Sequence, residues 1–142
     1  MKALRFAVLG VGLLVGSVAA QAQKITVEAN IPFAFTVDKT ALPAGEYRIE
    51  SLAASDRVLS IRNVDQDVNA LTFSNSCQSP ERSAKTKLVF HRFGDRYLLA
   101  EVWVRGKDLG HQIPKSKRRE ELMAERRVPD EIIVAAKTSS SR

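Results

Sequence analysis

The chain has 142 residues, 44% of them hydrophobic, and a formal net charge of +6. This length suits one domain with a single core. The one cysteine, Cys77, excludes an internal disulfide, and the net charge is mild.

The first 22 residues have the layout of a secretory signal peptide. Two basic residues precede an uncharged run at 6–20, which ends in the A-x-A sequence of a cleavage site. The run of about 15 residues is shorter than the roughly 20 that a membrane-spanning helix needs, which argues against an uncleaved anchor. We expect cleavage after Ala22, with Ala20 as the second choice. The mature chain would then be periplasmic or extracellular, with no transmembrane span and a net charge of +4, two below +6.

Between residues 23 and 136, apolar side chains recur mainly at every second position, which is the period of a β-strand. About eight short strands with turn residues between them predict an all-β fold, either an antiparallel sandwich or a small barrel. Alternation alone does not distinguish these two architectures. The predicted strands are, in chain order, 24–30, 33–37, 46–50, 57–63, 68–74, 86–93, 96–105 and 131–136.

The segment "LPAGEY" at 42–47 contains the clearest turn in the first half of the chain. Pro43 fixes its own φ, and Gly45 tolerates positive φ. Tyr47 and Ile49 then resume the core-facing alternation. The segment is therefore interpreted as a folding signal and not as a site.

Gly94 and Asp95 join two long strands and predict a two-residue hairpin turn of type II′. The second of these strands is apolar on both faces, so we expect it in the middle of the domain. The turn fixes the register across the hairpin. The predicted pairs are Phe93–Arg96, Arg92–Tyr97, His91–Leu98, Phe90–Leu99, Val89–Ala100 and Leu88–Glu101.

One short helix is predicted at 115–127, with Ser116 as its N-cap and Pro129 after its end. Its apolar stripe is narrow, which indicates a C-terminal surface helix. The small polar residues of 137–142 predict a disordered tail. The single β-rich domain would then span 23–136.

The predicted helix is rich in basic residues, which are the candidates for binding anionic envelope polymers or lipid head groups. Three glutamates in the segment leave a local charge of +3, and pairs such as Lys117 with Glu121 give the alternative of a solvated helix. No nucleic acid partner is expected for an exported chain, and no aromatic residues lie among these charges. The candidates are Lys115, Lys117, Arg118, Arg119, Arg126 and Arg127.

Catalytic and metal-binding motifs are absent from the sequence. His91 and His111 lack the spacing of a zinc site, and no G-x-S-x-G or C-x-x-C sequence occurs. We therefore expect no metal, no cofactor and no enzymatic activity. Glu101 stands out because it lies in the most apolar strand; it is either a buried carboxylate with a raised pKa or a paired or edge-exposed one. Cys77, in a polar stretch, is either a buried or a reactive thiol.

Four stretches carry a resemblance that covers most of the mature chain: "IPFAFTV", "LPAGEYRIE", "KLVFHRFGDRYLLAEVWV" and "PKSKRREELMA". They resemble a group of short exported bacterial proteins of unknown function, which share an IPFxFxV strand, an LPAGxY turn and a C-terminal PxSxxxE helix. The resemblance implies one exported β-rich domain. It implies no catalytic residues.

These observations predict a non-enzymatic exported protein of the cell envelope with a binding or structural role. One alternative is a carrier of a small apolar ligand inside a β-barrel. Another is a hydrolase with dispersed catalytic residues, because a catalytic triad is recognised by geometry. The aromatic residues that would fill a core, or line the cavity of a carrier, are Phe33, Phe35, Tyr47, Phe73, Phe90, Tyr97 and Trp103.

Overall fold

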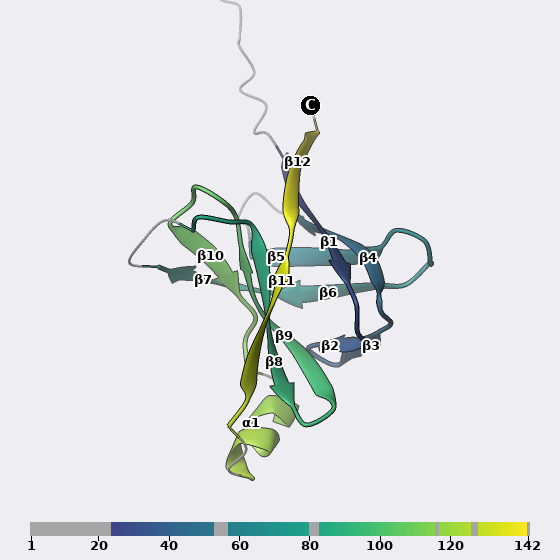
Figure 1. The fold of residues 1–142 in the computed structure, drawn as a ribbon, viewed down its shortest axis with the longest axis vertical. Helices are drawn as coiled ribbons and strands as arrows, with labels where there is room; N and C mark the ends of the chain where they lie inside the picture. The colour runs from purple at the N-terminus through teal and green to yellow at the C-terminus, as the bar shows by residue number, and fades with distance from the viewer. Residues whose placement is uncertain (1–23, 53–56, 80–82, 116, 126–127, 142) are drawn as a thin grey trace, which may run out of the picture.

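Two packed β-sheets and one short helix make up the protein (Figure 1). The computed structural model describes residues 24–52, 57–79, 83–115, 117–125 and 128–141. These residues form twelve strands in two sheets with no closed barrel, so the predicted all-β class is confirmed and its sandwich form is favoured. The predicted signal peptide lies outside the described residues. In the described part of the chain, no helix has the length and apolar character needed to cross a bilayer.

The first sheet contains five strands in the order β12-β1-β4-β5-β6. All its neighbouring pairs are antiparallel. The strands are β1 (Lys24–Ile31), β4 (Gly45–Ser51), β5 (Val58–Asn63), β6 (Asn69–Phe73) and β12 (Lys137–Ser141).

The second sheet follows the order β11-β8-β9-β10-β7, with β2 alongside β9 and β3 alongside β2. The strand predicted to be central, now β9, indeed has β8, β10 and β2 as neighbours. The strands are β2 (Phe35–Val37), β3 (Thr40–Leu42), β7 (Asn75–Gln78), β8 (Lys87–Phe93), β9 (Arg96–Trp103), β10 (Leu109–Gln112) and β11 (Asp130–Ala135).

The main core lies between the two sheets and takes every second residue from most strands. Burying these side chains removes apolar surface from water, at roughly 25 cal/mol per Å². Tyr47, Ile61, Leu88 and Phe90 are among its fully buried members. Two predicted core aromatics are exceptions: Phe73 is 71% exposed, and Trp103, although buried, lies outside this core.

Contacts of Tyr47 and Gly45 fix the conformation of the segment "LPAGEY". The buried hydroxyl of Tyr47 donates a hydrogen bond of 2.5 Å to the backbone oxygen of Pro43. Gly45 has φ of 155°, and a Cβ there would lie 2.9 Å from Nδ2 of Asn63. The segment therefore ties the start of β4 to the end of β5, as a folding signal would.

The β8–β9 hairpin matches the predicted register near its turn and departs from it further along. Gly94 has the positive φ (62°) of a type II′ turn, and the pairs from Phe93–Arg96 to Phe90–Leu99 are as predicted. A β-bulge then leaves Ala100 without a partner on β8. The predicted pairs Val89–Ala100 and Leu88–Glu101 are wrong; the observed pairs are Val89–Glu101 and Leu88–Val102.

The bulge decides which face of the sheet carries Glu101. Leu99 faces the core, so strict alternation would have put Glu101 on the core face as well. The extra residue reverses the alternation, and Val102 joins the core in its place. Glu101 therefore lies on the outer face of the second sheet, together with Trp103.

Helix α1 (Lys117–Ala124) lies at the turn end of this hairpin (Figure 1). It is shorter than the predicted 115–127, and Leu122 packs with Phe93 and Leu98 of the hairpin. The predicted N-cap, Ser116, lies outside the described residues.

The C-terminal tail is the largest departure from the predicted elements. The residues of 137–141, expected to be disordered, form β12 and pair with β1 from Lys24–Ser141 to Glu28–Lys137. The chain passes from β11 in the second sheet straight into β12 in the first (Figure 1). Polar residues suffice here because the pairing uses backbone groups.

Candidate functional site

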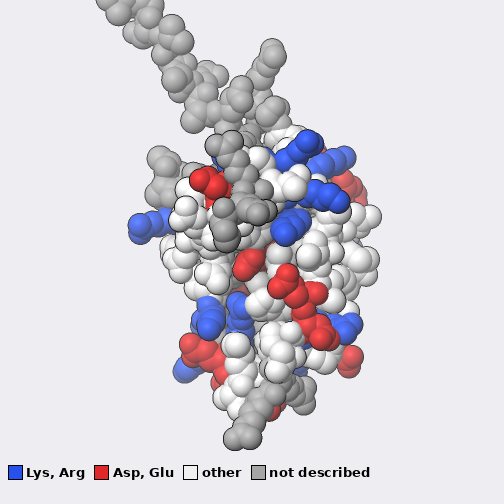
Figure 2. Space-filling model, turned by 60° about the vertical axis from the view of Figure 1, so that its left-hand side comes forward, with Lys and Arg blue, Asp and Glu red and all other residues white. Residues whose placement is uncertain are grey.

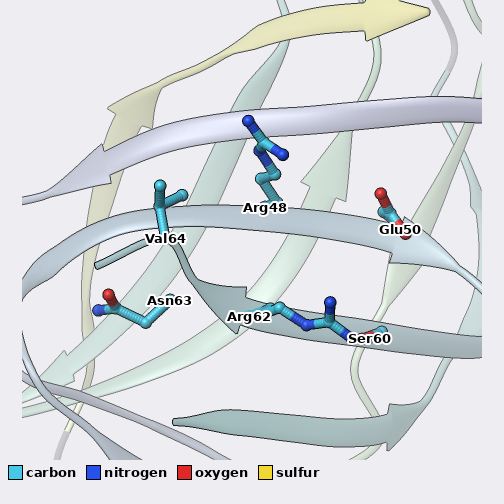
Figure 3. Close-up of a pocket in the computed structure, with 6 residues that line it drawn as sticks. All are labelled: Arg48, Glu50, Ser60, Arg62, Asn63 and Val64. Atoms are coloured by element: carbon cyan, nitrogen blue, oxygen red, sulfur yellow. The ribbon is translucent and has the colours of Figure 1, made fainter. Parts of the chain in front are cut away.

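The outer face of the first sheet carries a polar hollow that we call the arginine pocket. It has a volume of about 160 Å³ and is lined by Arg48, Glu50, Ser60, Arg62, Asn63 and Val64 (Figure 3). Alternation places Arg48, Glu50, Ser60 and Arg62 there, because Tyr47 and Ile49 on β4, with Leu59 and Ile61 on β5, point into the core. Asn63 and Val64 close the pocket at the end of β5.

Two arginines on neighbouring strands line this pocket. Arg48 on β4 and Arg62 on β5 are direct cross-strand partners. Like charges in this relationship repel, so the arrangement destabilises the sheet unless a negative group lies nearby. In Figure 3, Arg48 rises from β4 while the side chain of Arg62 runs along β5 towards Ser60.

Neighbouring carboxylates only partly neutralise the two cations. Nε of Arg48 lies 3.4 Å from Glu28 on β1, and the same glutamate has Lys137 Nζ at 3.9 Å from its other oxygen. Glu50 accepts a hydrogen bond of 3.3 Å from Thr26. Among the described residues, Arg62 makes no ion pair. With two arginines and one glutamate, Glu50, among the residues that line it, the pocket carries a net charge of +1.

Asn63 has a structural role at the inner end of the pocket. Its Oδ1 accepts hydrogen bonds from the backbone amides of Asp65 and Gln66, at 2.8 and 2.9 Å. These bonds shape the turn from β5 to β6 and hold the end of β5. The β4–β5 register that places Arg62 opposite Arg48 is supported by the amide of Val64, which donates a hydrogen bond of 2.9 Å to the carbonyl of Glu46.

The chemistry of the arginine pocket is that of anion recognition. A guanidinium offers up to five donors in a fixed fork that matches carboxylate and phosphate oxygens, and it stays protonated. Ser60, which also lines the pocket, adds a hydroxyl that can donate to the same anion. The pocket is smaller than the 300–1,000 Å³ of a typical small-molecule site, so it suits an oxyanion group and not a whole large ligand.

The six basic residues predicted from the sequence do not form one exposed surface. Arg119 was predicted to lie on an exposed binding surface, but its side chain is only 6% exposed and contacts the second sheet. Lys115 and Lys117 are exposed, as predicted for a surface-binding segment. The side chain of Arg118, and residues Arg126 and Arg127, lie outside what the structure describes.

Arg119 belongs to a second cluster of polar side chains, which lies on the outer face of the second sheet. It contacts Nδ1 of His91 on β8. Burial lowers the pKa of His91, the charge of Arg119 lowers it further, and Glu101 and Glu131 act in the opposite direction. Burial also lowers the pKa of Arg119, which Glu101 partly offsets. Arg119 therefore holds α1 on the sheet.

Glu101 is close enough to Cys77, His91 and Arg119 for its charge to act on each of them. Glu101 accepts a hydrogen bond of 2.7 Å from the indole of Trp103. His111 Nδ1 lies 3.1 Å from the hydroxyl of Ser74. Cys77 is half-buried, and burial followed by the charge of Glu101 raises the pKa of its thiol, which disfavours the reactive thiolate.

Charge on the surface is mixed. Figure 2 shows Lys and Arg interspersed with Asp and Glu, and neither sign covers the whole of the face in view. Across the described ranges, no group of three or more His, Cys, Asp or Glu side chains is placed to hold a metal ion.

The core-facing alternation of Tyr47 and Ile49 puts Arg48 and Glu50 on the opposite face of β4, but the sequence alone does not reveal the arginine pocket. The signal that was available is the period-two alternation, which assigns Arg48 and Arg62 each to a solvent face. Their juxtaposition depends on the β4–β5 register, which alternation does not set.

No family model, no curated protein and no solved structure matches this chain.

Proposed function

We propose that this protein is a non-enzymatic exported protein that binds oxyanion groups of the cell envelope through the arginine pocket. The ligand groups are phosphates or carboxylates carried by envelope polymers or lipid head groups. Export is supported by residues 1–22, which have the layout of a secretory signal peptide.

One observation carries the proposal: Arg48 and Arg62 are direct partners across neighbouring strands. Two like charges opposite each other reduce the stability of the sheet. An oxyanion between them would convert that repulsion into two charge-assisted interactions. Binding is therefore the role that best accounts for this pair.

The two alternatives have less support. A carrier of an apolar ligand needs an internal cavity, and the two sheets close no barrel in the described part of the chain. A hydrolase needs a nucleophile that a substrate can reach. The hydroxyl of Ser74 lies 3.1 Å from Nδ1 of His111, but Ser74 is only 3% exposed, so this serine–histidine contact is closed to a substrate.

The proposal is tested with two double variants that each remove two positive charges. Arg48→Gln with Arg62→Gln alters the pocket, and Lys115→Gln with Lys117→Gln alters the exposed basic residues beside α1. Retention on a phosphate-bearing matrix is measured against salt concentration. We expect the pocket variant to bind at least about tenfold more weakly than the helix variant, since charge-assisted hydrogen bonds are the stronger kind.

Equal losses in both variants would mean that retention reflects net charge alone, and the proposal would be abandoned. A selective loss in the helix variant would move the site to the basic segment. Thermal unfolding of both variants shows whether the sheet remains folded.

A further inference from the structure

Four apolar residues continue the outer face of the first sheet beyond the arginine pocket. Leu52 is 50% exposed, Leu71 is 62% exposed and Phe73 is 71% exposed, with Val58 half-buried between them. We call these residues the apolar patch.

Strand register places the apolar patch directly beside the arginine pocket. Leu71 is the cross-strand partner of Ser60, which lines the pocket, and Phe73 is the partner of Val58. The amide of Leu52 donates a hydrogen bond of 2.9 Å to the carbonyl of Val58 on the other side. Because two residues span roughly 7 Å along a strand, the patch begins about 7 Å from Arg62 and extends to about 14 Å.

Folding does not account for these exposed side chains. Ala70 and Thr72, which alternate with Leu71 and Phe73 on β6, are the residues that this strand buries. A single exposed apolar residue is ordinary. Several exposed apolar residues close together, in contrast, mark a surface that interacts with a protein or a membrane. β6 is moreover an edge strand of its sheet, so this face stands at the margin of the domain.

We propose that the arginine pocket and the apolar patch together form a docking face for the surface of an anionic lipid bilayer. Lipid phosphates bind Arg48 and Arg62, while Phe73 and Leu71 enter the boundary between head groups and acyl chains. This inference rests on the proposed function and names its ligand as a lipid surface.

Two features favour a bilayer over a single extracted lipid or a soluble polymer. The pocket has a volume of about 160 Å³, below that of a typical small-molecule site, which suits a head-group phosphate and not an acyl chain. The apolar side chains stand out from the sheet, as do those of proteins that lie in a membrane interface. A soluble polyanion would gain nothing from Leu71 and Phe73.

The test uses protein exported and processed by an expression host, with the N-terminus determined by mass spectrometry. Co-sedimentation is measured with vesicles of phosphatidylglycerol and phosphatidylcholine, and with vesicles of phosphatidylcholine alone. We expect binding to the anionic vesicles and at least about tenfold weaker binding after Leu71→Ser with Phe73→Ser, because those side chains lose their apolar burial.

A matched control removes exposed apolar residues elsewhere, with Val128→Ser and Ile133→Ser, which are 90% and 56% exposed. This variant should bind vesicles like the unaltered protein. Equal binding by the patch variant and the control would overturn the inference, as would equal binding to neutral vesicles.

Failure of this inference is distinguishable from failure of the proposed function. Retention on the phosphate matrix that depends on Arg48 and Arg62, without any vesicle binding, would reject the lipid surface and keep the oxyanion site. If the unaltered protein neither is retained on the phosphate matrix nor binds vesicles, both proposals are rejected. Phe73 and Leu71 are exposed, so their replacement leaves the core intact.

Discussion

The guanidinium of Arg119, on α1, donates a hydrogen bond to Nδ1 of His91, on the outer face of the second sheet. Arginine has donors only, so Nδ1 must accept, and the imidazole is neutral with its proton on Nε2. Protonation of His91 would place two positive charges in contact beneath the helix, with Glu101 of β9 and Glu131 of β11 as the nearby counter-charges.

This pair predicts that the protein loses stability in mild acid. The pKa of His91 is lowered by folding, so the unfolded chain binds the proton more readily than the folded chain. The stabilising contribution is complete above the unfolded pKa of about 6.5 and is lost as the pH falls through the lower folded value. Urea midpoints measured between about pH 8 and pH 5 should show this decrease.

The variant His91→Gln removes the titrating group and should flatten that part of the profile. An identical slope in the variant and the unaltered protein would show that other groups cause the acid sensitivity.

The bulge predicts that Ala100 can be deleted while the faces of β9 are kept. Without it, Leu99, Glu101 and Val102 would still alternate core, outside, core, and we expect a loss of about 1–3 kcal/mol from altered packing. Deletion of Val89 from the facing strand, by contrast, turns the fully buried Leu88 outward and should cost more, about 2–5 kcal/mol. Denaturant unfolding of both deletions measures the difference. Similar losses would indicate that the assigned bulge does not set the faces.

Gly110→Ala should disturb the single tryptophan. A Cβ at this buried position would lie 2.6 Å from Cε3 of Trp103, so the ring must move. We expect a loss of about 1–3 kcal/mol and a shifted fluorescence emission maximum, because the indole also donates to Glu101. Gly106→Ala is the matched control: its φ of 78° makes alanine strained, but no atom lies within 4 Å of the added Cβ. That control should leave the emission unchanged; if Gly110→Ala leaves it unchanged too, the contact is wrong.

Removing residues 137–142 tests whether β12 is a structural strand. The truncated chain loses the pairing with β1, together with the contacts of Lys137 and Ser139 to Glu28, which are 3.9 and 3.3 Å long. We expect the free energy of unfolding to fall by about 1–3 kcal/mol, and the newly exposed edge of β1 to promote self-association. Urea unfolding and size-exclusion chromatography measure the two effects. A disordered tail would leave both unchanged.

The sequence was informative where a side-chain pattern and a turn act together. Alternation with Gly94 at the turn predicted the hairpin correctly as far as Phe90 and Leu99. Beyond that point Ala100 is small and apolar and fits either face, so nothing in the pattern revealed the bulge. The pairing of β12 depends on backbone groups, which composition does not report.

In the candidate sites too, the sequence predicts local placement but not the contacts between distant residues. Alternation assigns Arg48 and Arg62 to solvent faces, but their opposition requires the register between β4 and β5. Arg119 was expected at the surface because a guanidinium is seldom buried, and only the position of α1 against His91 explains its burial. Charge and period are local properties of a sequence, whereas these contacts join residues far apart in it.

The position of β1 between β4 and β12 has a consequence for the order of assembly. β1, the first described strand, pairs on one side with β4, which follows it closely in the sequence. On the other side it pairs with β12, the last described strand. A chain that emerges N-terminus first must therefore keep one edge of β1 open until residues 137–141 appear. Closing such a long loop is slow compared with forming a hairpin. During this interval the open edge of β1 can pair with the strand of another chain, so it is the point at which the unfinished fold is exposed to aggregation.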